Sequence, residues 1–112
     1  MKNLEFVLLL DCYGSLLTER QRDLLDGYYN EDLSLAELAE PRGISRQAVH
    51  DSIRRGERQL QAFETQMGLA ERLRNCQKLF ADIEALAKML PDADAELAEK
   101  IAKTAQNGMA IL

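Results

Sequence analysis

The sequence predicts an all-α protein, with a helix-turn-helix head followed by a tail of further helices. Glycine and proline number only six and two among 112 residues, while Ala, Leu, Glu, Gln and Arg, which favour helices, are abundant. Apolar residues recur at spacings of three and four along much of the chain. Several of these periodic segments begin at a Ser or Thr suited to cap a helix.

Two helices are expected at the start of the chain. The first spans residues 3–13 and is closed by Gly14. After a short connector, Thr18 opens the capping-box sequence T-E-R-Q, in which Gln21 stands three residues on. The second helix therefore begins at Thr18 and ends near Tyr29, before the polar turn at residues 30–32.

A third helix and a long fourth helix follow, separated by a glycine turn. Ser34 opens a second capping box, S-L-A-E, and the third helix covers residues 35–40 because the ring of Pro41 is expected to stop it. Gly43 supplies the turn and Ser45 caps the fourth helix. Steps of four and three mark the apolar seam of that helix: Val49, Ile53, Gly56, Leu60, Phe63 and Met67.

Residues 68–112 predict a tail of two more helices. Gly68 ends the fourth helix, and the fifth repeats the heptad spacing until Pro91 ends it. A weaker sixth helix runs from about Ala93 to Gly108. We expect a head at 1–67 and a tail at 68–112 within one compact unit. The seam of the fifth helix, with three extra apolar positions, comprises Leu69, Leu73, Cys76, Phe80, Ile83, Ala87 and Leu90, with Leu79, Leu86 and Met89.

The apolar faces of the fourth to sixth helices leave two arrangements open. The fourth and fifth helices could close on each other as an antiparallel hairpin around Gly68, with the sixth helix covering the extra apolar positions of the fifth in a monomer, or the faces could meet a second subunit. Because helix-turn-helix proteins usually present two half-site readers, we expect a homodimer through these three helices.

The stretch from Leu35 to Arg58 carries the pattern of a helix-turn-helix. A small residue, Ala39, stands where the two helices would touch, and Gly43 four positions later tolerates positive φ. Ile44 is placed to fill the corner, while Val49 and Ile53 would pin the second helix to the first. The pattern predicts a nucleic-acid-binding head, with a winged-helix-like fold as the expected variant.

The charge distribution points to the same stretch. The chain has 14 basic and 19 acidic residues. Residues 1–44 hold four basic and nine acidic residues, whereas residues 45–60 hold four arginines and only two acidic residues, Asp51 and Glu57. Arginine and glutamine suit guanine and adenine edges, and a helix N-terminus favours phosphate. The alternative is that the arginines only balance acidic neighbours. The candidate nucleic-acid-binding residues are Ser45, Arg46, Gln47, His50, Arg54, Arg55 and Arg58.

Other classes of function find little support in the sequence. It has no Gly-rich phosphate loop, no HExxH and no G-x-S-x-G, so we expect no enzyme. One histidine and two separated cysteines, Cys12 and Cys76, predict reduced thiols rather than a metal site, and we expect no cofactor. The apolar run at residues 6–10 is too short for a membrane span, so we expect a cytoplasmic protein.

Four blocks of sequence resemble the YlxM family of small bacterial proteins, whose helix-turn-helix is similar to region 4 of sigma factors. They are LDCYGSLLTERQ at 10–21, GYY at 27–29, SLAELA at 34–39 and SRQAVHD at 45–51. The resemblance covers about residues 4–65, with His50 at a position where the family commonly has tyrosine.

The resemblance implies a cytosolic protein whose gene neighbours those of the signal recognition particle, with a role in that secretion pathway. We therefore expect a DNA-binding regulatory protein. The alternatives are an accessory protein that binds the particle's GTPase or its RNA, and a dimeric scaffold that binds no nucleic acid.

Overall fold

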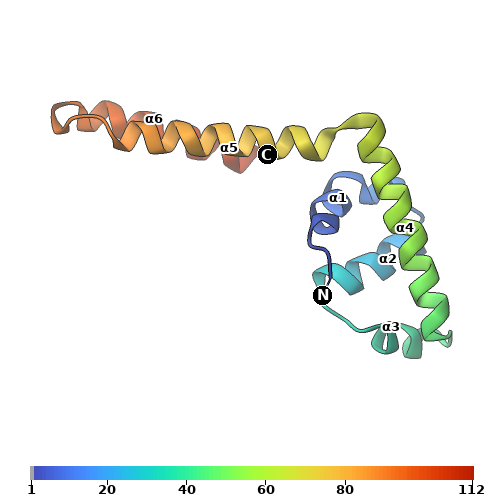
Figure 1. Ribbon diagram of the computed structural model, residues 1–112. Helices are drawn as coiled ribbons and strands as arrows, with labels where there is room; N and C mark the ends of the chain where they lie inside the picture. Colours follow the sequence, from blue (N-terminus) through green and yellow to red (C-terminus); the bar gives the residue numbers. More distant parts are fainter. Residues whose placement is uncertain (1) are drawn as a thin grey trace. The chain divides into compact units, whose positions relative to one another are not determined.

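A computed structural model describes residues 2–112, and every element in that range is a helix (Figure 1). The chain divides into two compact units, one up to Ala70, called the head, and one at Glu71–Leu112, called the hairpin. The all-α prediction is confirmed. No strand occurs within residues 2–112, so the winged-helix-like variant is wrong, because a wing needs a β-hairpin. The helical tail is as predicted.

The head consists of four α-helices and two short helical turns. Its elements in order are α1 (Glu5–Tyr13), η1 (Gly14–Leu16), α2 (Glu19–Leu25), η2 (Asp26–Asn30), α3 (Leu35–Arg42) and α4 (Arg46–Met67).

The two predicted capping boxes behave differently. At Ser34 the box is complete: its Oγ accepts from the Glu37 N–H at 3.1 Å, and Glu37 Oε1 accepts from the Ser34 N–H at 3.2 Å. At Thr18 only half of the box forms, because Oγ1 accepts from the Gln21 N–H but the Gln21 side chain bonds the Thr18 hydroxyl. Both residues nevertheless begin their helices as predicted.

The second helix ends earlier than expected, because α2 stops at Leu25 and gives way to η2, a π-helical turn. The reason lies at Gly27, where a Cβ atom would stand 2.6 Å from Leu38 Cδ2. The bare glycine lets this turn rest directly on α3, and the wider turn sets the direction in which the chain leaves.

The third helix extends past Pro41 to Arg42, so the predicted stop at residue 40 is wrong. Pro41 lies in the last turn, where the carbonyls find other donors. The Gly43 N–H bonds the carbonyls of Ala39 and Glu40, and Arg42 Nη1 donates to the Leu38 carbonyl at 2.9 Å. These bonds close the helix end around the proline.

The apolar seam of α4 forms the central wall of the head, since α4 packs against α1, α2 and α3. Val49 and Leu60 are fully buried, and Gly56 sits so close to Leu25 that a Cβ atom would lie 2.6 Å from its Cδ1. This burial inside the head excludes one of the open arrangements, the pairing of the α4 seam with the fifth helix. The buried core comprises Phe6, Leu9, Leu10, Tyr13, Leu17, Leu24, Leu25, Tyr29, Leu38, Ala39, Val49, Ile53, Leu60 and Ala70.

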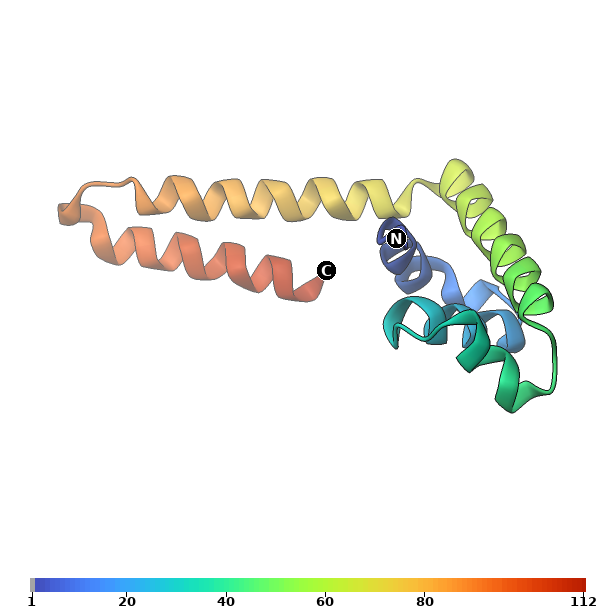
Figure 2. The ribbon, with the colours of Figure 1, turned by 60° about the horizontal axis from the view of Figure 1, so that its bottom comes forward.

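The hairpin is made of α5 (Leu69–Lys88), η3 (Asp92–Asp94) and α6 (Ala95–Ile111), and Figure 2 shows α5 and α6 side by side and antiparallel. Gln106 Nε2 donates to Glu84 Oε1 across the pair at 3.1 Å. The predicted end of the last helix at Gly108 is wrong, because the helix continues to Ile111. The glycine instead permits close packing, since a Cβ there would lie 2.5 Å from the Phe80 ring.

Within residues 2–112, no helix is both long and apolar enough to cross a membrane.

Candidate nucleic-acid interface

The turn between α3 and α4 has the geometry of a helix-turn-helix. Gly43 has a φ of 65° and ends α3, and the Ile44 N–H bonds the Ala39 carbonyl at 3.3 Å. Ala39 is buried between the helices, while Ile44 is half-buried against the core. Val49 is buried as the pinning residue. The helix-turn-helix prediction is therefore confirmed.

Ser45 prepares the exposed N-terminus of α4. Its backbone is extended and its Oγ accepts from the Ala48 N–H at 3.0 Å, as in a standard N-cap. The hydroxyl hydrogen can still donate, and the first N–H groups of α4 carry the positive end of the helix dipole. This end of α4 is therefore suited to bind a phosphate group.

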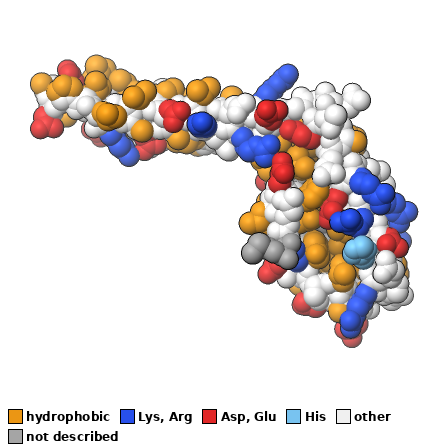
Figure 3. All heavy atoms as spheres, in the orientation of Figure 1, with side chains coloured by type: hydrophobic (Ala, Val, Ile, Leu, Met, Phe, Trp, Pro, Cys, Tyr) orange, Lys and Arg blue, Asp and Glu red, His pale blue; other side chains and the backbone are white. Residues whose placement is uncertain are grey.

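All seven predicted site residues have exposed side chains, and all lie on or just before α4. Gln47, Arg54 and Arg58 follow one another at steps of seven and four, on the side of the helix opposite the buried seam. Figure 3 shows Lys and Arg side chains gathered with the histidine along α4. The predicted residues within α4 thus all lie on its exposed half, with Arg46 and Arg55 on its opposite flanks. We call this surface, with the capping serine, the α4 face: Ser45, Arg46, Gln47, His50, Arg54, Arg55 and Arg58.

The arginines of the α4 face are not used inside the protein. Within residues 2–112, none of the four forms an ion pair with a carboxylate. Arg58 Nε donates to the backbone carbonyl of Arg54 at 3.3 Å, which holds the Arg58 side chain along the helix. Four exposed guanidinium groups on one helix of an acidic protein therefore remain for an external anionic partner.

Asp51 contacts two of the predicted site residues, although it was not itself among them. Its Oδ1 accepts from Gln47 Nε2 at 2.9 Å and lies 3.5 Å from His50 Nδ1. The carboxylate therefore orients two candidate reading residues from the middle of the face. The negative charge of Asp51 disfavours a phosphate beside it, but its carboxylate can accept a hydrogen bond from a cytosine amino group.

The α4 face borders a polar contact that fixes α4 to the rest of the head. The Tyr29 hydroxyl donates to Glu57 Oε1 at 2.7 Å. Burial of the ring, followed by this hydrogen bond, raises the pKa of Tyr29 far above its usual range. Tyr29 is therefore neutral and donating at physiological pH, and it holds Glu57, which lines the same pocket as Arg54 and Arg58.

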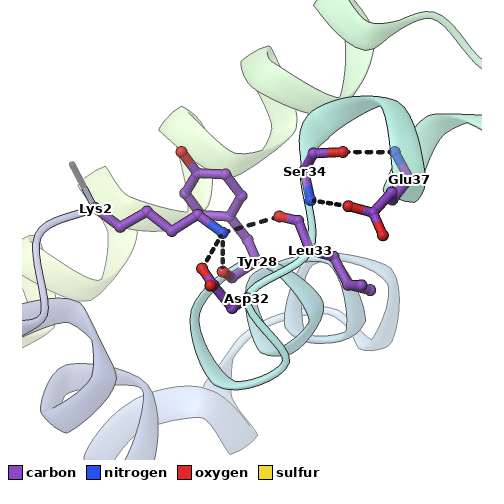
Figure 4. Close-up of polar contacts among 6 residues, drawn as sticks. All are labelled: Lys2, Tyr28, Asp32, Leu33, Ser34 and Glu37. Carbon is purple, nitrogen blue, oxygen red and sulfur yellow. Dashed lines mark hydrogen bonds and ion pairs between the residues drawn. The ribbon is translucent and has the colours of Figure 1, made fainter.

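Lys2 holds the loop that leads into α3, which sequence reasoning also missed (Figure 4). Its Nζ donates to the carbonyls of Tyr28 and Leu33, pairs with Asp32 at 3.1 Å and lies 3.9 Å from the centre of the Tyr28 ring. Asp32 has a φ of 54°, an uncommon backbone conformation outside glycine. The lysine thus stabilises a strained loop directly before the capping box at Ser34.

No group of three or more His, Cys, Asp or Glu side chains in the described part of the chain could hold a metal ion. The Cys12 and Cys76 side chains are each half-buried.

Fold and face together define a helix-turn-helix protein. The model of the UPF0122 family, described as "Putative helix-turn-helix protein, YlxM / p13 like", matches residues 1–104 and so extends beyond the motif blocks into the hairpin. The chain therefore belongs to this family.

Bacterial relatives support the assignment. A UPF0122 protein of Clostridium kluyveri is 43% identical over 103 residues, which cover 91% of this chain and 93% of the relative. A UPF0122 protein of Symbiobacterium thermophilum is 51% identical over 88 residues, covering 77% and 82% of the two chains. A third, from Shouchella clausii, is 44% identical over 82 residues, covering 73% and 75%.

Proposed function

We propose that this protein is a DNA-binding regulatory protein that places the N-terminal half of α4 in the major groove. The observation that carries the proposal is the α4 face, where four exposed arginines without internal ion pairs lie on the second helix of a helix-turn-helix. Helices in that position read base edges with their N-terminal residues.

Each residue of the α4 face has a proposed role. Ser45 and the helix N-terminus bind a phosphate, while Arg46 and Gln47, in the first turn, reach base edges. Arg54, Arg55 and Arg58 lie further along the helix and hold the phosphate backbone. His50 stays beside Asp51 at the edge of the reading surface. In this role the protein acts in the cytoplasm, without catalysis, as a homodimer.

Fluorescence anisotropy with labelled duplex DNA over a salt series tests this proposal. We expect Arg54→Ala to weaken binding to every duplex and to reduce the salt slope by about one unit. Gln47→Ala should weaken binding to a selected sequence by about 5- to 100-fold and leave random duplexes almost unchanged. Lys103→Ala, which removes an exposed charge from α6, is the matched control and should change neither value.

Two results would contradict the roles proposed for the α4 face in DNA binding. One is binding to duplex DNA that is as tight after Arg46→Ala and Arg54→Ala as before. The other is equal loss on all sequences from both Gln47→Ala and Arg54→Ala, which would remove the proposed division between reading and holding.

The second candidate function is that of an accessory protein of the signal recognition particle, which binds its GTPase or its RNA. The overall acidity of the chain and the large exposed apolar side chains of α5 favour this candidate. Anisotropy with the particle's RNA over the same salt series distinguishes the two. Salt-sensitive binding to that RNA, with little affinity for duplex DNA, would favour the accessory role and reassign the α4 face to RNA phosphates.

A further inference from the structure

The hairpin has two apolar rows on α5, and only one of them faces α6. Leu73 and Phe80 are half-buried and Ala87 is buried, at steps of seven, on the side toward α6. A second row follows at steps of four, three and four, with its last member two residues beyond the end of α5, and is exposed: Leu79, Ile83, Leu86 and Leu90, with 61%, 42%, 64% and 37% of their surface accessible. This second row has the spacing of a coiled-coil seam without a partner in the hairpin.

A row with the same steps of four, three and four runs along α6, formed by Leu97, Ile101, Thr104 and Gly108. Leu97 and Ile101 supply its large apolar side chains, and Gly108 packs against the Phe80 ring. Two adjoining grooves join the rows into one face. The first, of about 250 Å³, includes Ile83, Ile101 and Thr104 in its lining. The second, of about 200 Å³, is lined by Ile83, Leu86, Ala87, Leu90 and Ile101. Figure 3 shows hydrophobic side chains along the visible side of the hairpin.

We propose that this α5–α6 face binds the same face of a second copy of the chain, with the two hairpins antiparallel in a four-helix bundle. The choice of a second copy as the binding partner rests on the homodimer of the proposed function. The surface and its geometry do not depend on DNA binding. A two-helix apolar face is the element from which such bundles are built, because each helix then contacts two neighbours.

Symmetry is the first argument for a second copy. The exposed row of α5 is centred between Ile83 and Leu86, and Thr104, in the middle of the α6 row, lines the same groove as Ile83. Both rows therefore share one midpoint. A two-fold axis through that midpoint superposes each row fully on its counterpart, as an isologous contact requires.

Charge is the second argument, and it sets the direction. Residues 82–103, around the turn of the hairpin, carry six acidic and three basic side chains, whereas residues 71–81 carry three basic and one acidic and residues 104–112 carry none. Lys78 and Arg72 lie about 10 and 19 Å along α5 from the midpoint. In the antiparallel pair they face the acidic turn of the other copy, with Asp92 and Asp94, whereas a parallel pair would place like charges together.

Sedimentation equilibrium of the full chain without nucleic acid tests the proposal. We expect a reversible dimer, and we expect Leu86→Glu to raise its Kd at least about 100-fold, because both copies lose a buried leucine and gain a buried charge. Ala85→Glu is the control: it adds the same charge at the next, exposed position outside the row and should change Kd less than about 3-fold. Circular dichroism checks that both variants keep their helices.

A charge exchange tests the direction. The variant Arg72→Glu with Lys78→Glu should dimerise about 5- to 10-fold more weakly than the wild type at low salt, as should Asp92→Lys with Asp94→Lys. Mixing the two variants should restore the affinity, because every acidic end then meets a basic one. In a parallel dimer the first variant would be no weaker than the wild type, which would overturn the antiparallel geometry.

Other outcomes overturn the proposal in ways that separate it from the proposed function. A chain that stays monomeric at all concentrations, yet binds duplex DNA through the α4 face, removes the second copy and leaves DNA binding intact. If Leu86→Glu leaves the dimer unaffected, the homodimer stands but forms through another surface. Leu86→Glu that abolishes binding to the particle's GTPase in a monomeric chain assigns the face to that protein instead.

Discussion

The head and the hairpin use similar apolar patterns with opposite results. In the described part of the chain, every buried apolar side chain lies in the head except Ala87 and Ala105. Most of the large exposed hydrophobic side chains lie in the hairpin, where Met89 and Ile111 are 79% and 86% exposed. Both regions have heptad-like rows, so the difference does not come from spacing.

The difference shows how many neighbours an apolar helix face needs. In the head, α4 is covered by three other helices, and its seam is buried from Val49 to Leu60. In the hairpin, α5 has one partner and one contact line, which leaves the rest of its wide apolar face open. A short two-helix unit buries too little surface to be stable by itself, so we expect the head to be the stable part.

Core truncation should separate the two regions most strongly. Leu24→Ala, at a fully buried position, should lower the free energy of unfolding of the head by about 2–5 kcal/mol. Met89→Ala in the hairpin should change stability by less than about 0.5 kcal/mol. Chemical denaturation followed by circular dichroism measures both, and an equal effect would show that the hairpin packs as tightly as the head.

Two of the tightly packed glycines, one in each region, give a matched pair of smaller effect. We expect Gly56→Ala to destabilise the head by about 1–3 kcal/mol, because its Cβ meets the fully buried Leu25. We expect Gly108→Ala to destabilise the hairpin less. The new Cβ contacts the half-buried Phe80 ring, which can turn toward solvent, and alanine has a higher helix propensity than glycine. Amide hydrogen exchange should therefore show less loss of protection in α6 than in α4. The opposite order would mean that the hairpin is the more rigid region.

The loop before α3 should depend on Lys2. Replacing Lys2 by methionine removes its bonds to two carbonyls and its contact with the Tyr28 ring, and we expect a loss of about 1–2 kcal/mol in the head. Faster amide exchange at Leu33 and Ser34 would show that the loop has loosened. Lys103→Met, at an exposed position of α6, should leave the same amides unchanged.

Alkaline pH should weaken the head alone, since all three tyrosines, Tyr13, Tyr28 and Tyr29, lie there. The pKa values of Tyr13 and Tyr29 are raised by burial, then by hydrogen bonds to Glu64 and Glu57. A raised pKa means that the stability is complete below the unfolded value of about 10 and is lost as the pH rises above it.

The variant Tyr29→Phe tests the source of that loss. It should cost about 1 kcal/mol at pH 8, through the lost bond to Glu57, and the gap to the wild type should narrow above pH 10. Chemical denaturation of both proteins at several pH values measures the loss at pH 8 and the change of the stability difference above pH 10. A gap that stays constant up to pH 11 would show that Tyr29 does not ionise on unfolding.

Local chemistry let the sequence predict much of the head and of the site. Caps at Thr18, Ser34 and Ser45 and positive-φ glycines at 43 and 68 depend only on neighbouring residues, and each stands where it was expected. The α4 face followed from helical period alone, because residues opposite a buried seam face outward. Binding of nucleic acid by that face stays a prediction.

Two helix ends differ from the sequence prediction for different reasons. Pro41 lies inside α3, whose last carbonyls accept from the nearby donors of Arg42, Gly43 and Ile44. Gly108 lies inside α6, where it packs against Phe80 of the neighbouring helix, a contact distant in sequence.

The sequence by itself determined that the chain is helical, where its main helices begin, which faces are apolar and which helix carries the exposed arginines. Only the tertiary structure decided that the α4 seam is covered within the head while an equally regular row on α5 remains open. The physical reason is that periodicity fixes the direction of a side chain relative to its own helix, whereas the helix that covers it is set by contacts distant in sequence.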